Sequence, residues 1–260
     1  MEKRKLENKD RIMVLTGNTK LNINYTNKMI DLSEDIRNEI KKYWELYGEN
    51  FTNGKIFYIS NFEYKNENDK LNLDVCNSSY DHYLYTRRKK EYDENSCINL
   101  WAGAVIQTSD NKLVLGEMSS STICEGEFHI SGGSTDIADV NGDTINYEKT
   151  MTRELYEEFG IDINDKRVVR NYALKYIKLP TIEEVELSFG ILYKINLNIT
   201  YSEFEEEYKE YLKYLKENNL EIEFTKPIAI DKNESAIRKA EKEYGNKIPK
   251  YTIELFLKDL

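Results

Sequence analysis

Residues 98–107 (INLWAGAVIQ) form a nearly continuous apolar run, and this run limits the possible folds more than any other segment. Such a run is typical of a strand that is buried on both faces of a sheet. Asp110 and Asn111 then predict a turn, so residues 112–116 are expected to return as the second strand of a hairpin. A globular protein built around a buried sheet is therefore expected.

The segments around this hairpin alternate between strand and helix patterns. Apolar residues at helical spacing predict a helix over residues 147–159, and a capping box of Ser202 and Glu205 predicts another that runs to residue 217. Further helices are expected after Ser33 and over residues 235–243 and 251–258. Strands are expected at residues 11–15, 20–25, 55–62, 71–75, 168–177, 185–197 and 220–230. This order indicates an α/β or α+β protein. No linker-like composition marks a domain boundary. We place the boundary at residues 93–96, between an N-terminal α+β domain (1–96) and a second domain (97–260).

Composition and charge exclude several classes of protein. The 260 residues carry a formal net charge of −10, which argues against a surface that binds nucleic acid. No apolar stretch approaches the roughly 18 residues of a membrane helix. Cys76, Cys97 and Cys124 are odd in number and share no short metal-type spacing. A reduced, cytoplasmic protein without a disulfide framework is the expectation.

One segment carries a pattern of charges that suggests chemistry: residues 153–161, RELYEEFGI. On a helix, Glu154, Glu157 and Glu158 fall within an arc of about 100°, beside an apolar stripe that can dock the helix on a sheet. Three carboxylates on one arc repel each other by a few tenths of a kcal/mol per pair, and a divalent cation reverses that sign. A solvated acidic face is the alternative interpretation of the triplet.

The same nine residues match R-E-U-x-E-E-x-G-U, the C-terminal half of the Nudix box, in which U is aliphatic. A glycine pair ends at Gly133, twenty residues before Arg153. On these motifs the chain resembles the Nudix hydrolase superfamily, and the resemblance implies an α/β/α sandwich with an additional N-terminal α+β domain. Two departures stand out: the position of a usual Glu is Ile145, and six extra residues separate Gly133 from Arg153.

The resemblance also implies an activity, namely metal-dependent hydrolysis of a nucleoside diphosphate linked to another moiety. It implies that Mg²⁺ (or Mn²⁺) is held by Glu154, Glu157, Glu158 and the carbonyl of Gly133. Glu154 or Glu158 would accept the proton, and Arg153 would orient the carboxylates. With Ile145 in place of the usual Glu, Asp143 or Glu148 is expected to pair with Arg153. One further acid is expected among Glu183, Glu184 and Glu186.

Residues 51–57 (FTNGKIF) and the interrupted box are similar to a group of Nudix proteins that includes UDP-sugar pyrophosphatases. That similarity suggests a nucleotide sugar as the small-molecule partner, with Thr86, Arg87, Arg88 and His129 as candidate substrate-binding residues. A solvated basic surface and a strand histidine with satisfied hydrogen bonds are the alternatives for these residues. ADP-ribose, dinucleotides or capped RNA ends stay open as substrates, and so does a non-catalytic ligand-sensing module.

Overall fold

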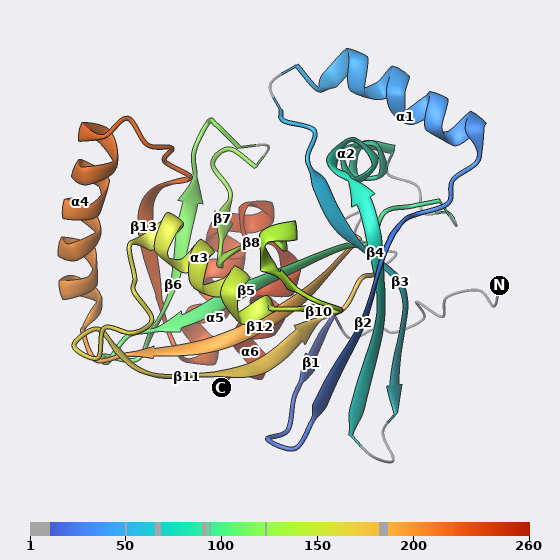
Figure 1. Ribbon diagram of the computed structural model, residues 1–260. Helices are drawn as coiled ribbons and strands as arrows, with labels where there is room; N and C mark the ends of the chain where they lie inside the picture. The colour runs from blue at the N-terminus through green and yellow to red at the C-terminus, as the bar shows by residue number, and fades with distance from the viewer. Residues whose placement is uncertain are drawn as a thin grey trace. The chain divides into compact units, whose positions relative to one another are not determined.

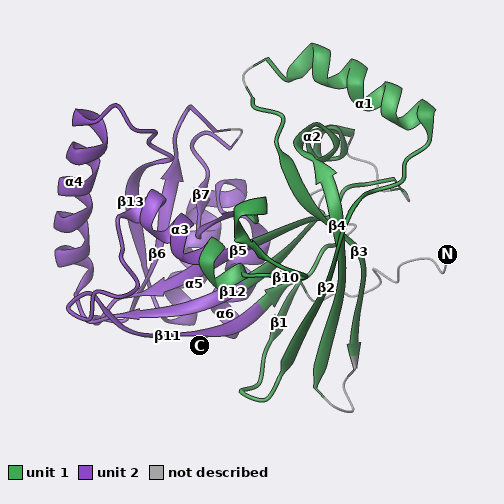
Figure 2. Cartoon of the chain, in the orientation of Figure 1, with its two compact units in different colours: residues 1–101, 134–150, 177–191 green, residues 102–133, 151–176, 192–260 purple. Residues whose placement is uncertain are grey.

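The chain divides into two compact units, each assembled from three separate stretches of sequence (Figure 2). The computed structural model describes residues 11–49, 51–65, 69–89, 93, 95–122, 124–181 and 187–260. The first unit comprises Met1–Trp101, Ser134–Thr150 and Ile177–Ile191, and the second comprises Ala102–Gly133, Met151–Tyr176 and Leu192–Leu260. The expected domain division between residues 96 and 97 stays a prediction. The compact first unit is a different division, because it also contains the two later stretches of sequence.

In the first unit, β3, β4 and β2 are hydrogen-bonded neighbours, in that order, in a mixed sheet (Figure 1). Strand β4 pairs parallel with β2 and antiparallel with β3, and β3 meets β5 at Tyr58 and Asn99. The helix α1 begins after Ser33, whose hydroxyl accepts a hydrogen bond from the Ile36 amide at 3.4 Å, as the sequence predicted. The elements of this unit are β1 Ile12–Val14, β2 Lys20–Met29, α1 Glu34–Tyr47, β3 Lys55–Lys65, β4 Lys70–Ser79, α2 Tyr80–Lys89, η2 Ile137–Asp139, β9 Val140–Asn141 and β10 Thr144–Ile145.

Helix α2 was not expected from the sequence. Its apolar and polar residues are not separated into two faces, and four of its ten side chains are nevertheless buried. His82 is one of them: its imidazole lies 2.8 Å from the Ser78 hydroxyl and 2.6 Å from the Asn95 carbonyl oxygen. Burial lowers the pKa of His82. Tertiary contacts, which a local pattern does not encode, therefore stabilise this helix.

The second unit places helices on both sides of its strands. In Figure 1, α3 lies in front of these strands, and α5 and α6 lie behind them. Strand β6 pairs antiparallel with β5, β7 and β13. The elements are β5 Asn99–Gln107, β6 Lys112–Met118, β7 Phe128–His129, β8 Ser131–Ser134, α3 Tyr147–Phe159, β11 Val169–Lys178, β12 Ser188–Leu197, α4 Tyr201–Glu217, β13 Phe224–Asp231, α5 Glu234–Tyr244, η3 Gly245–Lys247 and α6 Lys250–Lys258; β5, β8, α3, β11 and β12 contribute residues to both units. The mixed α/β fold class expected from the sequence is confirmed.

Two boundaries of the second unit differ from the expectation. The capping box that opens α4 is formed by Thr200 and Glu203, so the prediction of Ser202 and Glu205 was wrong by two residues. Both pairs have the right spacing, and the structure selects the one at which the backbone is extended. Strand β13 begins at Phe224, so the expected strand over residues 220–230 was placed about four residues too early. No helix in the described part of the chain is long and apolar enough to cross a membrane.

Candidate active site

The helix α3 carries the three glutamates on which the candidate site depends. Its apolar stripe of Met151, Leu155 and Phe159 is buried as predicted. The Phe159 ring packs at 4.9 Å from the ring of Phe224, which anchors the C-terminal end of the helix in the second unit. With the apolar stripe fixed inward, the neighbouring glutamate arc lies at the edge of the buried face.

The glutamates are not a solvated face. Glu154 is 6% exposed and Glu158 is 3% exposed, while the side chain of Glu157 is 51% exposed. Carboxylates are rarely buried unless they are paired or bind a cation, because burial removes their hydration. The burial of two members of the triplet therefore disagrees with the alternative interpretation of a solvated acidic surface.

The glycine pair of β8 lies against these buried carboxylates. The amide of Gly132 donates a hydrogen bond of 2.9 Å to Oε2 of Glu158. At Gly133, a β-carbon would overlap the carboxylate group of Glu154, so a larger residue there would require the Glu154 side chain to move. The structure thus places the glycine pair beside Glu154 and Glu158 of α3.

Arg153 lies between two of the glutamates. Its Nη1 atom is 2.7 Å from Oε1 of Glu154 and 3.1 Å from Oε2 of Glu157. The expected role of Arg153 in orienting the carboxylates of a metal site stays a prediction. Pairing of Arg153 with Asp143 or Glu148 stays a prediction.

A fourth acid, Glu223, was missed by the sequence reasoning. It lies directly before β13 and is half-buried, and its charge contributes to the raised pKa values of both Glu154 and Glu158. The further acid had been expected among Glu183, Glu184 and Glu186, which lie outside the described residues. Sequence alone contains no signal for Glu223, because only the pairing of β13 with β6 brings it into this unit's core.

Among the residues that the structure describes, the electrostatics of the cluster show a shortage of positive charge. Burial raises the pKa of Glu154 to about 7, against the lowering effect of Arg153. Burial and the charge of Glu154 raise the pKa of Glu158 well above its ordinary value, although Ser131 and the Gly132 amide lower it. Burial also raises the pKa of Glu223. One arginine does not neutralise this group of carboxylates.

A divalent metal ion fits this donor set. Mg²⁺ and Mn²⁺ prefer carboxylate and carbonyl oxygens, and the site offers several carboxylates, of which that of Glu154 lies against the backbone of Gly133. Glu154, Glu157, Glu158 and the Gly133 carbonyl stay the predicted ligands, and in the described structure the three carboxylates do not all lie within 4.8 Å of one another. A bound cation would offset the repulsion and the burial that raise the carboxylate pKa values.

The candidate substrate-binding residues have different surroundings. Thr86 is 2% exposed, and its hydroxyl accepts a hydrogen bond of 2.8 Å from the Cys97 amide; a substrate contact of this buried residue stays a prediction. Arg87 donates to the Tyr83 hydroxyl at 3.2 Å, and Arg88 is exposed. His129 lies on β7, where its Nε2 atom is 2.8 Å from Oε2 of Glu127. A substrate contact of Arg87, Arg88 or His129 stays a prediction.

Comparisons with known proteins return Nudix hydrolases among similar solved structures. A Nudix hydrolase from Nitrosomonas europaea is 12% identical, with 62% of this chain and 87% of that chain covered and a TM-score of 0.37. The MutT protein from Methanosarcina mazei is 12% identical, with 61% and 90% covered and a TM-score of 0.32. A bifunctional NMN adenylyltransferase/ADP-ribose pyrophosphatase from Francisella tularensis, complexed with AMP and a manganese ion, is 10% identical, with 62% and 41% covered and a TM-score of 0.37.

No family model matches this sequence, and no curated protein matches it. At the identities and TM-scores of the three structures, similarity assigns no function to this chain. Function has to be argued from the carboxylate cluster itself.

Proposed function

We propose that this chain is a divalent-metal-dependent Nudix pyrophosphohydrolase that cleaves a nucleoside diphosphate linked to another moiety. The observation that carries the proposal is the burial of Glu154 and Glu158 on α3 against the Gly132–Gly133 backbone, with one arginine to balance them. If the same glutamates lay on a solvated helix face, water would stabilise their charges and they would not require a cation.

Each residue of the cluster has a role in this proposal. Glu154, Glu157 and Glu158 hold the metal, and Arg153 keeps the carboxylates of Glu154 and Glu157 in place through the contacts of 2.7 and 3.1 Å. When bound, the cation supplies charge neutralisation for a diphosphate and acidifies water for attack on phosphorus. In this proposal Glu154 accepts the proton of the attacking water. Glu158 and Glu223 are the other carboxylates available for that role.

A nucleotide sugar is the substrate class that we propose within this activity. Support comes from the sequence phrase at residues 51–57 and from the basic residues Arg87 and Arg88 of α2, which could meet a phosphate. ADP-ribose, dinucleotides and capped RNA ends are the competing substrates. The retained glutamate triplet disfavours a non-catalytic ligand-sensing module, since such a module has no need of buried carboxylates.

The test is a hydrolysis screen of the purified chain with Mg²⁺ or Mn²⁺ against nucleotide sugars, ADP-ribose, NADH and dinucleoside polyphosphates. We expect metal-dependent release of a nucleoside monophosphate from at least one of them, and loss of that release in Glu158→Gln. An inactive wild-type chain with a native circular dichroism spectrum would contradict the enzymatic proposal. Activity that survives complete removal of divalent metal would contradict the metal dependence.

A further inference from the structure

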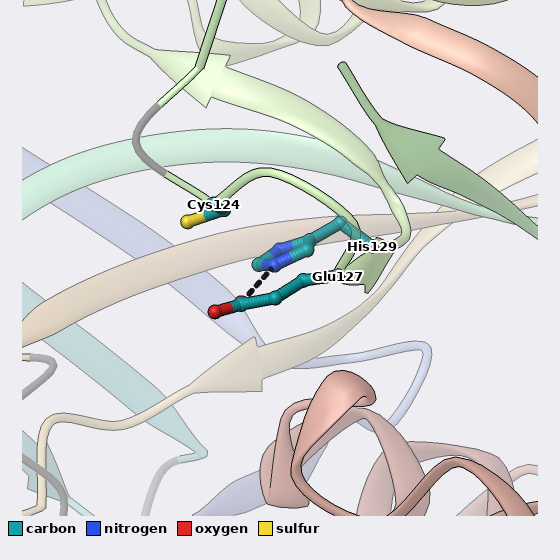
Figure 3. A group of neighbouring side chains, drawn as sticks. All are labelled: Cys124, Glu127 and His129. Carbon is teal, nitrogen blue, oxygen red and sulfur yellow. Dashed lines mark hydrogen bonds and ion pairs between the residues drawn. The ribbon is translucent and has the colours of Figure 1, made fainter. Parts of the chain in front are cut away.

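A second group of possible metal ligands lies in the loop that joins β6 to β7. The ligand atoms of Cys124, Glu127 and His129 all lie within 4.8 Å of one another (Figure 3). Figure 3 shows the three side chains directed toward a common point, with the thiol on one side and the carboxylate and imidazole on the other. Cys124 is buried, and the other two side chains are partly exposed. In the described part of the chain, this is the group of Cys, His and acidic side chains that meets this distance.

The backbone of the loop sets up this arrangement. The amide of Glu127 donates to the carbonyl of Cys124 at 2.9 Å, which closes a four-residue turn. Gly126, the third residue of the turn, has a φ of 74°, and a positive φ at this turn position favours glycine. The turn therefore holds Cys124 beside Glu127 before any ligand binds.

The strand places the third side chain. Glu127 and His129 are two residues apart where the chain enters β7, and in an extended segment such residues share one face. Pairing of His129 with Gly116 and hydrogen bonding of the Met118 amide to the Glu127 carbonyl at 2.8 Å fix this segment on β6. The three side chains are thus presented by a closed turn and a paired strand.

The chemistry of the three donors differs from that of the carboxylate cluster. A thiolate, an imidazole and a carboxylate are the ligands of Zn²⁺, whereas Mg²⁺ takes oxygen donors. We propose that Cys124, Glu127 and His129 bind one Zn²⁺ ion, with water at the fourth tetrahedral position. The proposal does not depend on the proposed function, since the two sites share no residue.

The existing distances suit this ion after small side-chain movements. Tetrahedral zinc with bonds of about 2.0–2.3 Å separates its ligand atoms by roughly 3.4–3.7 Å. Contraction from distances of up to 4.8 Å, and a slight widening of the 2.8 Å contact between Glu127 and His129, would reach that range. Binding would release the thiol proton of Cys124. The ordinary alternative is a hydrogen-bonded Glu127–His129 pair beside a buried thiol that never meets a metal.

Cobalt(II) is the probe that separates these possibilities, because only a thiolate ligand produces a near-ultraviolet sulfur-to-cobalt charge-transfer band. The full chain, freed of metal with a chelator and kept reduced, is titrated with Co²⁺ in excess Mg²⁺, without substrate. We expect one equivalent to develop the band and one equivalent of Zn²⁺ to remove it. The band should be absent in Cys124→Ser and intact in the matched control Cys76→Ser.

The other two ligands are tested by affinity. His129→Gln and Glu127→Gln should each weaken Zn²⁺ binding by at least about 100-fold, because even indirect disturbance of a metal site costs 10–100-fold. Circular dichroism of each metal-free variant checks folding, and if Cys124→Ser fails to fold, these two variants decide. No band in the wild-type chain, a band that persists in Cys124→Ser, or wild-type zinc affinity in His129→Gln would each overturn the site.

Discussion

Asp259 and two glutamates of α3, Glu154 and Glu158, are buried in the second unit, but the charges around Asp259 differ from those around the glutamates. Asp259 is 4% exposed and contacts the ammonium groups of Lys175 at 2.9 Å and Lys232 at 3.1 Å. Lys194 and the Tyr176 hydroxyl also bond to the same carboxylate. Three cations thus surround one anion, whereas a single arginine serves the glutamate cluster.

Because of this difference, we interpret the Asp259 cluster as structural and propose the glutamate cluster as the functional one. Burial raises the pKa of both kinds of carboxylate, yet the charge of Lys194 brings the pKa of Asp259 down to about 2. Without enough positive charge, the pKa of Glu154 rises to about 7. The Asp259 carboxylate is neutralised by lysines of the chain itself. Among the described residues the glutamates of α3 lack comparable positive charge, and we therefore propose that a cation from solution binds there.

The largest effect is expected from removal of the anion in the structural cluster. Asp259→Asn leaves Lys194 buried without its counter-ion, so it should lower the free energy of unfolding by about 3–5 kcal/mol, measured by urea denaturation. The matched control is Asp231→Asn, because Asp231 pairs with Lys112 at 2.9 Å but its side chain is 60% exposed. The control should lose at most about 1 kcal/mol. Equal losses in the two variants would remove the distinction between buried and exposed pairs.

The second effect concerns the pH dependence of the metal-free chain. An unfolded glutamate loses its proton near pH 4.5, whereas folded Glu154 keeps it to about pH 7. Between these values the unfolded state releases the proton first, so stability from Glu154 falls as pH rises, by about 3 kcal/mol in total. Asp259 has the opposite sign, since its stability is lost as pH falls from 3.8 toward about 2.

Urea denaturation in a chelating buffer, from pH 4.5 to 8, measures this fall. Glu154→Gln should flatten the curve, so that the difference between the variant and the wild-type chain grows with pH. Saturating Mg²⁺ should restore the stability of the wild-type chain at pH 8. If the plots of unfolding free energy against pH were parallel for the wild-type chain and Glu154→Gln, the pKa of Glu154 would not be raised by folding.

The third effect is catalytic. Glu157→Gln or Glu158→Gln should lower kcat by at least about 10²-fold, about 2.7 kcal/mol, while the fold stays intact. The matched control is Glu206→Gln on α4, where the side chain is 75% exposed and lies 3.3 Å from the ammonium group of Lys209. Wild-type turnover in the Glu157 and Glu158 variants at saturating metal would refute the assignment.

The smallest effect tests charges that lie on the surface. Arg88→Ala or Arg87→Ala should raise KM about tenfold, about 1.4 kcal/mol of binding, with kcat little changed, if one of them meets the substrate phosphate. Arg238→Ala on α5 is the control, because its side chain is 49% exposed and no substrate role is proposed for it. Steady-state kinetics and thermal unfolding decide: unchanged KM and stability in both variants would make these arginines a solvated surface.

Much of the fold could be predicted because periodicity is a local property. The apolar run at residues 98–107 became β5, and the stripe of Met151, Leu155 and Phe159 became the buried side of α3. Where two local signals competed, the sequence could not choose. The cap of α4 is Thr200 and not Ser202, and α2 formed without an amphipathic pattern because its neighbours bury it.

At the candidate site, the sequence by itself determined which carboxylates lie close together along the chain. The tertiary structure decided which of these carboxylates are buried and which residues from other segments lie beside them. The spacing in RELYEEFGI placed Glu154, Glu157 and Glu158 on one arc, since helix geometry requires it. Their burial, the approach of Gly133 and the charge of Glu223 depend on strands paired far apart in sequence. Pairing of those strands lowers the local hydration, and that change makes an acidic helix face into a candidate metal site.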